Sequence, residues 1–158
     1  YRFLGDHGTQ NGFCSERWYY FDMEEILEKL KKYFTERDDV LMAFLFGSQS
    51  KGLARSESDI DIAIYLKTQN GEMDFESENN FESEDKIWLD LEKLLSKRVD
   101  LVVLNRAPAE VAFAAMNNGK EILVKDFNLR TKFILLASSV AEDMRDFASD
   151  FLEIKARS

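Results

Sequence analysis

The sequence predicts an α/β (α+β) fold in which helices flank a small mixed β-sheet and the chain ends in a long helix. Three observations lead to this prediction. Residues 40–46 form a continuous apolar run, which is typical of a strand buried on both faces. Residues 59–66 alternate between two kinds of side chain, as a second strand does. Other segments space their apolar residues as helices do, so the predicted order is helix, strand, strand, helix, strand, helix, strand, helix.

The first predicted helix begins at Met23, where Asp22 is placed to cap its N-terminus. Residues 1–22 lack an initiating Met and show no clear periodicity. We interpret them as an N-terminal extension, either an added or poorly ordered segment or a genuine arm, and we expect residues 23–158 to form a single domain. The apolar face of the helix consists of Ile26, Leu27, Leu30, Tyr33 and Phe34.

The second half of the chain supplies the remaining predicted elements. A helix is predicted over residues 85–95 and a third strand over residues 98–104. Proline suits a first helical turn and glycine a helix end, so the next helix is predicted from Pro108 to Gly119. Residues 120–126 are predicted to form a short edge strand. The last helix is predicted from about residue 127 to 154, with an apolar stripe that we expect to pack in the core, any exposed remainder offering a partner surface. This stripe consists of Phe133, Leu136, Val140, Met144, Phe147 and Phe151.

A long polar connection separates the second strand from the next helix. Residues 72–85, EMDFESENNFESED, contain seven acids and no base. We expect a solvated, mobile loop here, and the alternative is a partner-binding or regulatory segment.

Composition excludes several classes of function. The 30 Asp and Glu residues outnumber the 21 Lys and Arg residues, and the net charge of −9 argues against a DNA partner because like charges repel. A single cysteine, Cys14, excludes a disulfide framework and a cysteine-based zinc site, and the single His7 leaves no histidine base in the body of the domain. No apolar run reaches the roughly 18 to 20 residues of a membrane span. We expect a soluble, cytoplasmic protein with no membrane partner.

Three aspartates form the candidate catalytic and metal site. Asp59 and Asp61 stand two residues apart on one predicted strand, so their side chains share a face at about 6 to 7 Å along the chain. Asp100, in the predicted third strand, can reach the same face; the alternative is a strand-edge acid paired to Arg98 or Arg106. Three carboxylates suit a hard cation such as Mg²⁺, and two such ions would support an in-line displacement.

The turn after the first strand is the candidate nucleotide-binding element. At Gly47 and Ser48 backbone N–H groups and a hydroxyl can approach a phosphate. Lys51 and Arg55 either neutralise a triphosphate or are simply solvated, and Ser58 either contributes a donor or caps the second strand. Carboxylates beside a phosphate-binding turn predict nucleotidyl transfer, in which pyrophosphate leaves.

These residues carry a family resemblance. Gly47-Ser48, ten intervening residues and Asp59-Ile60-Asp61 resemble the GS-x10-D-x-D motif of the polymerase-β-like nucleotidyltransferase superfamily. The small size and the later VDLVVL run resemble its minimal, MntA-like branch, over about residues 24–125. The resemblance implies the polymerase-β-like nucleotidyltransferase fold, triphosphate binding by Gly47 and Ser48, two Mg²⁺ ions at Asp59 and Asp61, and Asp100 beside the attacking hydroxyl.

The resemblance also implies a partner. Proteins of this branch are commonly antitoxins that transfer AMP from ATP to a tyrosine of a HEPN-domain RNase toxin and so silence it. The alternatives are an antitoxin that neutralises its toxin by binding alone, and a nucleotidyltransferase that acts on a small molecule or RNA.

Overall fold

The computed structural model describes residues 13–47 and 59–156, without the side chains of residues 13–21, 151 and 154. Four strands in this part of the chain form a mixed sheet of order β3-β2-β1-β4. β1 (Val40–Phe46) pairs antiparallel with both β2 (Ile60–Leu66) and β4 (Lys120–Val124). β3 (Val99–Val103) runs parallel to β2 and forms the opposite edge. The mixed sheet and the edge position of β4 are therefore confirmed.

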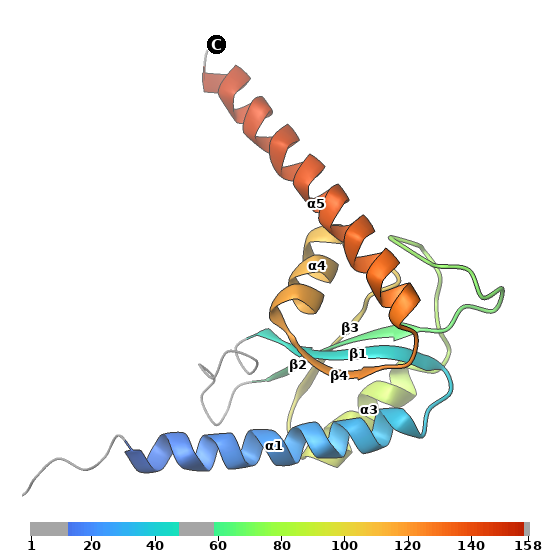
Figure 1. Ribbon diagram of the computed structural model, residues 1–158, viewed down its shortest axis with the longest axis vertical. Coiled ribbons are helices and arrows are strands. Elements are labelled where there is room, and N and C mark those ends of the chain that lie inside the picture. Colours follow the sequence, from blue (N-terminus) through green and yellow to red (C-terminus); the bar gives the residue numbers. More distant parts are fainter. Residues whose placement is uncertain (1–12, 48–58, 157–158) are drawn as a thin grey trace, which may run out of the picture.

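Helices cover both faces of the sheet (Figure 1). α1 (Phe13–Thr35) and α3 (Glu84–Leu95) pack on one face, and α4 (Ala109–Asn118) and α5 (Phe127–Ala156) pack on the other. β2 follows the predicted alternation, because Ala63 and Tyr65 belong to the α4 and α5 side. Its aliphatic side chains pack against α1 and α3: Ile60, Ile62, Ile64 and Leu66.

The first helix is longer than predicted. α1 begins at Phe13, so Asp22 lies inside the helix, where its carboxylate is 3.6 Å from the Lys97 ammonium, and does not cap it. No glycine or proline interrupts residues 13–22, so nothing in this stretch ends a helix. The expected start at Met23 was therefore wrong.

The last helix leaves the body of the protein part of the way along its length. Phe133, Ala137 and Ala141 are buried, whereas Met144 and Phe147 are 59% and 71% exposed. A helix of 30 residues is about 45 Å long, and strands of five to seven residues span only about half of that. The prediction that the whole apolar stripe packs in the core is therefore wrong beyond Ala141, where α5 projects past the sheet (Figure 1). Despite the length of α5, none of the described helices combines the length and the apolar composition that crossing a bilayer requires.

The acidic connection is a largely exposed loop up to the start of α3, as expected, but hydrogen bonds attach it to the fold. The Tyr65 hydroxyl accepts a hydrogen bond from the Asp74 backbone N–H at 2.7 Å. The Glu76 carboxylate accepts one from the Ala109 N–H, at the start of α4, at 2.8 Å. The Ser77 N–H donates to the Asn105 carbonyl at 3.0 Å. These bonds fasten the connection across the end of the sheet that contains the C-terminus of β2.

Asn105 is the buried polar residue at this end of the sheet. Its side-chain carbonyl accepts from the Leu66 N–H and its amide donates to the Leu66 carbonyl, both at 2.9 Å. The side chain thus continues the β2–β3 pairing by one step where β3 has already ended. It satisfies two backbone groups that water does not reach.

We predict that Asn105→Ala lowers the free energy of unfolding by about 2 to 4 kcal/mol, since it leaves both Leu66 groups without partners. The matched control is Asn117→Ala, at an exposed position near the end of α4, which should change stability by less than about 0.5 kcal/mol. Urea titration followed by circular dichroism measures both. Equal losses in the two variants would contradict the role given to Asn105.

Candidate active site

The parallel pairing of β2 with β3 sets two aspartates side by side. Asp61 is the direct partner of Asp100, as Ile60 is of Val99. Neighbouring strands lie about 4.8 Å apart, and paired residues of parallel strands point to the same face. That face is the one covered by α4 and α5, because Ala63 follows Asp61 at a spacing of two residues. The expectation that Asp100 reaches the same face as Asp61 is confirmed.

Asp59 stands just before β2 and is about half exposed. Its carboxylate lies 4.0 Å from the Arg98 guanidinium, which is 86% exposed, so solvent screens this contact strongly. Arg106 forms an ion pair with Glu84. The two arginines considered as partners of Asp100 therefore contact other acids within the described residues.

Burial and neighbouring negative charges both act on the Asp61 carboxyl. Burial raises the pKa of the Asp61 carboxyl, and the negative charges of Asp100 and Asp59 raise it further. In the described part of the chain no three potential ligands are gathered into a ready-made metal site, so the side chains would have to turn inward around an ion. Two aspartates paired in register and a third just before the strand nevertheless fit a hard cation such as Mg²⁺, which prefers oxygen ligands.

Gly47 lies directly against the Asp61 carboxylate. Its backbone has a φ of +73°, and a Cβ built on it would stand 2.1 Å from Asp61 Oδ2 and 2.8 Å from Cγ. Phe46, the residue before it, is the strand partner of Asp61. Only glycine avoids both the backbone strain and the collision. The position of the Asp61 carboxylate therefore requires glycine at position 47. This requirement is separate from the predicted contact of the turn with a phosphate.

Several candidate residues lie outside the described part of the chain: Ser48, Lys51, Arg55 and Ser58. Their roles stay predictions. Tyr65, which shares the face of Asp61, is a core residue whose ring packs edge-on against Phe133 at 5.2 Å between centroids.

Sequence reasoning missed two residues next to the carboxylates. A cavity of about 420 Å³ is lined by Trp88 and Glu92 of α3 together with Asp59 and Asp100. The available signal was the position of Trp88, which lies off the buried stripe formed by Ile87 and Leu91. A large aromatic side chain outside the buried face of its helix is a candidate contact residue.

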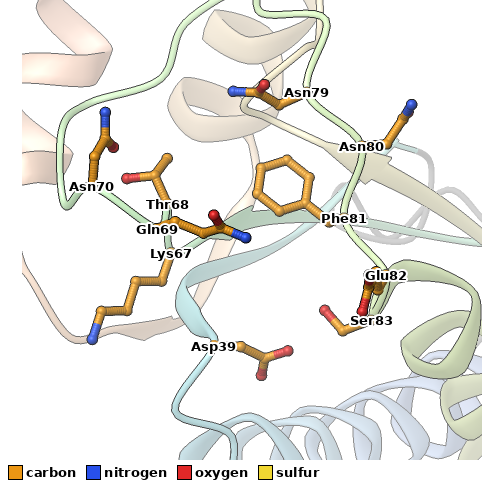
Figure 2. Close-up of a pocket in the computed structure, with 10 residues that line it drawn as sticks. All are labelled: Asp39, Lys67, Thr68, Gln69, Asn70, Asn79, Asn80, Phe81, Glu82 and Ser83. Atoms are coloured by element: carbon orange, nitrogen blue, oxygen red, sulfur yellow. The ribbon is translucent and has the colours of Figure 1, made fainter.

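A larger cavity lies elsewhere. About 670 Å³ in volume, it lies between Asp39 and the connection after β2, and Phe81 and four amide side chains line it (Figure 2). Asp39 precedes β1 and Lys67 follows β2, whereas Gly47 and Asp61 stand at the other ends of these strands. This cavity is therefore separate from the carboxylate site.

Comparison with known families and proteins points to one chemistry. The family model described as "Polymerase beta, Nucleotidyltransferase" matches residues 28–128. A relative from Methanocaldococcus jannaschii, named "Putative protein adenylyltransferase MJ1379", is 35% identical over 85 residues, which are 51% of this chain and 74% of the relative.

Solved structures with the same fold come from toxin-antitoxin complexes. A chain described as "toxin-antitoxin with AMP-PNP" matches with a TM-score of 0.62 and 20% identity, covering 84% of this chain and 98% of that one. A chain from the complex of a tri-AMPylated Shewanella oneidensis HEPN toxin with MNT antitoxin matches with a TM-score of 0.56 and 17% identity, covering 87% and 98%. At these identities the similarity concerns the fold.

Two glycines with the same backbone conformation allow a direct test of the Gly47 contact. Gly71 also has a φ of +73°, but a Cβ there would meet nothing within 4 Å. We predict that Gly47→Ala and Gly71→Ala each destabilise the fold by about 1 to 2 kcal/mol, the cost of a left-handed alanine. Only Gly47→Ala should also weaken nucleotide and Mg²⁺ binding, because it displaces the Asp61 carboxylate. Thermal unfolding and equilibrium binding of ATP with Mg²⁺ measure the two effects, and equal binding in both variants would refute the contact's importance.

Proposed function

Because the chain belongs to the polymerase beta nucleotidyltransferase family, we propose that it is the antitoxin of a toxin-antitoxin pair, one that transfers AMP from ATP to a tyrosine hydroxyl of a HEPN RNase toxin. The observation that carries the proposal is the alignment of Asp61 with Asp100, with Gly47 packed on the Asp61 carboxylate. The relative named as a protein adenylyltransferase supports AMP transfer to protein. The fold shared with chains of toxin-antitoxin complexes, one of which contains an AMPylated HEPN toxin, supports this choice of partner.

The residues divide into two groups in this proposal. Asp59, Asp61 and Asp100 would hold two Mg²⁺ ions, and Gly47 and Ser48 would hold the triphosphate of ATP, with Lys51, Arg55 and Ser58 contributing contacts to it. The ions would supply positive charge to the phosphates and to the oxygens that enter and leave. The catalytic domain is residues 23–158, with residues 13–22 prolonging its first helix, and the reaction takes place in the cytoplasm.

The transfer itself follows from the position of Asp100. It is exposed on the edge strand, whereas Asp61 is partly buried on the inner strand, so an acceptor can reach Asp100 from outside. The acceptor oxygen attacks the α-phosphorus of ATP and forms a new P–O bond while the bond between the α-phosphorus and the bridging oxygen breaks. Pyrophosphate leaves with that bond's electron pair, and the Asp100 carboxylate takes the hydroxyl proton.

We predict that Asp59→Ala plus Asp61→Ala lowers AMP transfer by at least about 100-fold, the scale of losing one group that stabilises transition-state charge. Intact-mass spectrometry of the toxin, mixed with the protein, ATP and Mg²⁺, detects each added AMP. The charge-matched control is Glu24→Ala plus Glu28→Ala, two exposed acids on α1, which should transfer AMP as the unaltered protein does.

RNA cleavage in the same mixtures separates the alternatives. If the Asp59 and Asp61 double variant still protects RNA although the toxin's mass is unchanged, neutralisation occurs by binding alone. If the unaltered protein releases pyrophosphate in the presence of small hydroxyl compounds but leaves the toxin's mass unchanged, the acceptor is a small molecule.

A further inference from the structure

The open edge of the sheet next to Asp100 is hollowed on both sides of Trp88. The cavity of about 420 Å³ already described lies toward Asp59 and Arg98. A second, of about 390 Å³, lies toward Asp85 and Leu101. The two cavities share Trp88, Val99 and Asp100 in their linings. A groove therefore follows the edge strand β3 past the proposed proton acceptor.

Two side chains from α3 form hydrogen bonds with the edge strand at Val99. The Trp88 indole N–H donates to the Val99 carbonyl at 2.9 Å, and the Val99 N–H donates to the Glu92 carboxylate at 3.2 Å. Both outward-facing backbone groups of Val99 are thus already hydrogen-bonded. The same bond holds the Trp88 ring in one orientation although 40% of the residue is exposed, which makes it a rigid aromatic contact for another molecule.

The next outward-facing residue of the edge is Leu101. Ile60 N–H donates to the Arg98 carbonyl and Leu104 N–H to the Ile64 carbonyl, so the even-numbered residues of this strand bond to β2. Val99, Leu101 and Val103 therefore direct their backbone groups outward. The Val103 carbonyl accepts from Arg106 and Ala107. Within the described residues no such hydrogen bond is made to the outward-facing backbone groups of Leu101, which lines the second cavity. One residue of an extended peptide can therefore pair with it.

The charges of the groove favour a basic peptide. Besides the aspartates of the site, Asp85 and Glu92 line it, and Glu84 is already paired with Arg106. Among the described residues that line these cavities, the basic side chain is Arg98, which lines the first cavity and faces Asp59. The protein as a whole carries a net charge of −9. A basic segment complements this edge both locally and over long range.

We propose that the β3 edge beside Trp88 is the binding site for the acceptor segment, and that this segment is an extended, basic stretch of polypeptide. It pairs with the backbone of Leu101, packs a side chain against Trp88 and presents its hydroxyl to Asp100 one strand spacing away. The proposal rests on the proposed function, in which the acceptor is a protein, and it adds the surface and the chemistry that recognise it.

The experiment measures steady-state AMP transfer to the HEPN toxin and separates KM for the toxin from KM for ATP. Trp88→Ala should raise KM for the toxin by about 10-fold or more, the effect of removing an interface anchor, and leave KM for ATP unchanged. Leu89→Ala, at an exposed neighbour on α3 that lines neither cavity, is the matched control and should change neither constant.

A second variant keeps the test independent of the folding of Trp88→Ala. Glu92→Gln retains an oxygen that can accept from the Val99 N–H but removes the charge, so it should raise KM for the toxin about threefold at low salt, with a smaller effect at high salt. Glu24→Gln, remote on α1, controls for net charge and should have no effect.

The outcomes distinguish this inference from the function on which it rests. If the unaltered protein adds no AMP to the toxin, the proposed function fails, and this inference fails with it. If it adds AMP but folded Trp88→Ala and Glu92→Gln have the same KM for the toxin as their controls, only the acceptor site is refuted.

Discussion

The in-register parallel pairing of β2 with β3 is the constraint on which the rest of the site depends, because it holds two like charges at neighbouring positions. Two unit charges about 4 Å apart repel by about 1 kcal/mol in water and about 4 kcal/mol near a protein surface. Against this, β2 buries four aliphatic side chains beneath α1 and α3, each contributing about 1.5 to 3 kcal/mol. Burial exceeds the repulsion, so the strand stays in place, and the pKa of the Asp61 carboxyl is raised first by its burial and then by the charges of Asp100 and Asp59.

Most of the fold could be predicted because each strand and helix has its own apolar pattern. The run at residues 40–46 became β1 without a change of bounds, and the alternation in β2 separated the two cores as expected. The errors arose where local pattern does not decide. The outer part of α5 keeps its apolar spacing although the sheet ends beneath it, and the hydrogen bonds that attach the acidic connection to Asn105 and Tyr65 depend on how the chain folds back on itself.

The residues of the candidate site could be predicted from the sequence, but the contacts between them could not. The spacing of Asp59 and Asp61 predicted one strand for both, but β2 begins at Ile60 and leaves Asp59 just before it. The position of Asp100 directly beside Asp61 depends on the register between β2 and β3. The contact of Gly47 with Asp61 is made between two neighbouring strands, so it cannot be seen in the sequence. A glycine in a sequence shows only that the backbone there can adopt a positive φ. Trp88 could not be assigned to the site because helical periodicity does not tell which sheet edge a residue will reach.

The docked and exposed parts of α5 should differ in local stability. A helix needs a costly first turn before further turns can be added with little additional free energy. Because the turns around Phe133 and Ala137 are docked on the sheet, we expect them to provide that nucleus and the exposed turns after Ala141 to extend from it. The exposed turns after Ala141 should therefore open more easily than the turns docked on the sheet.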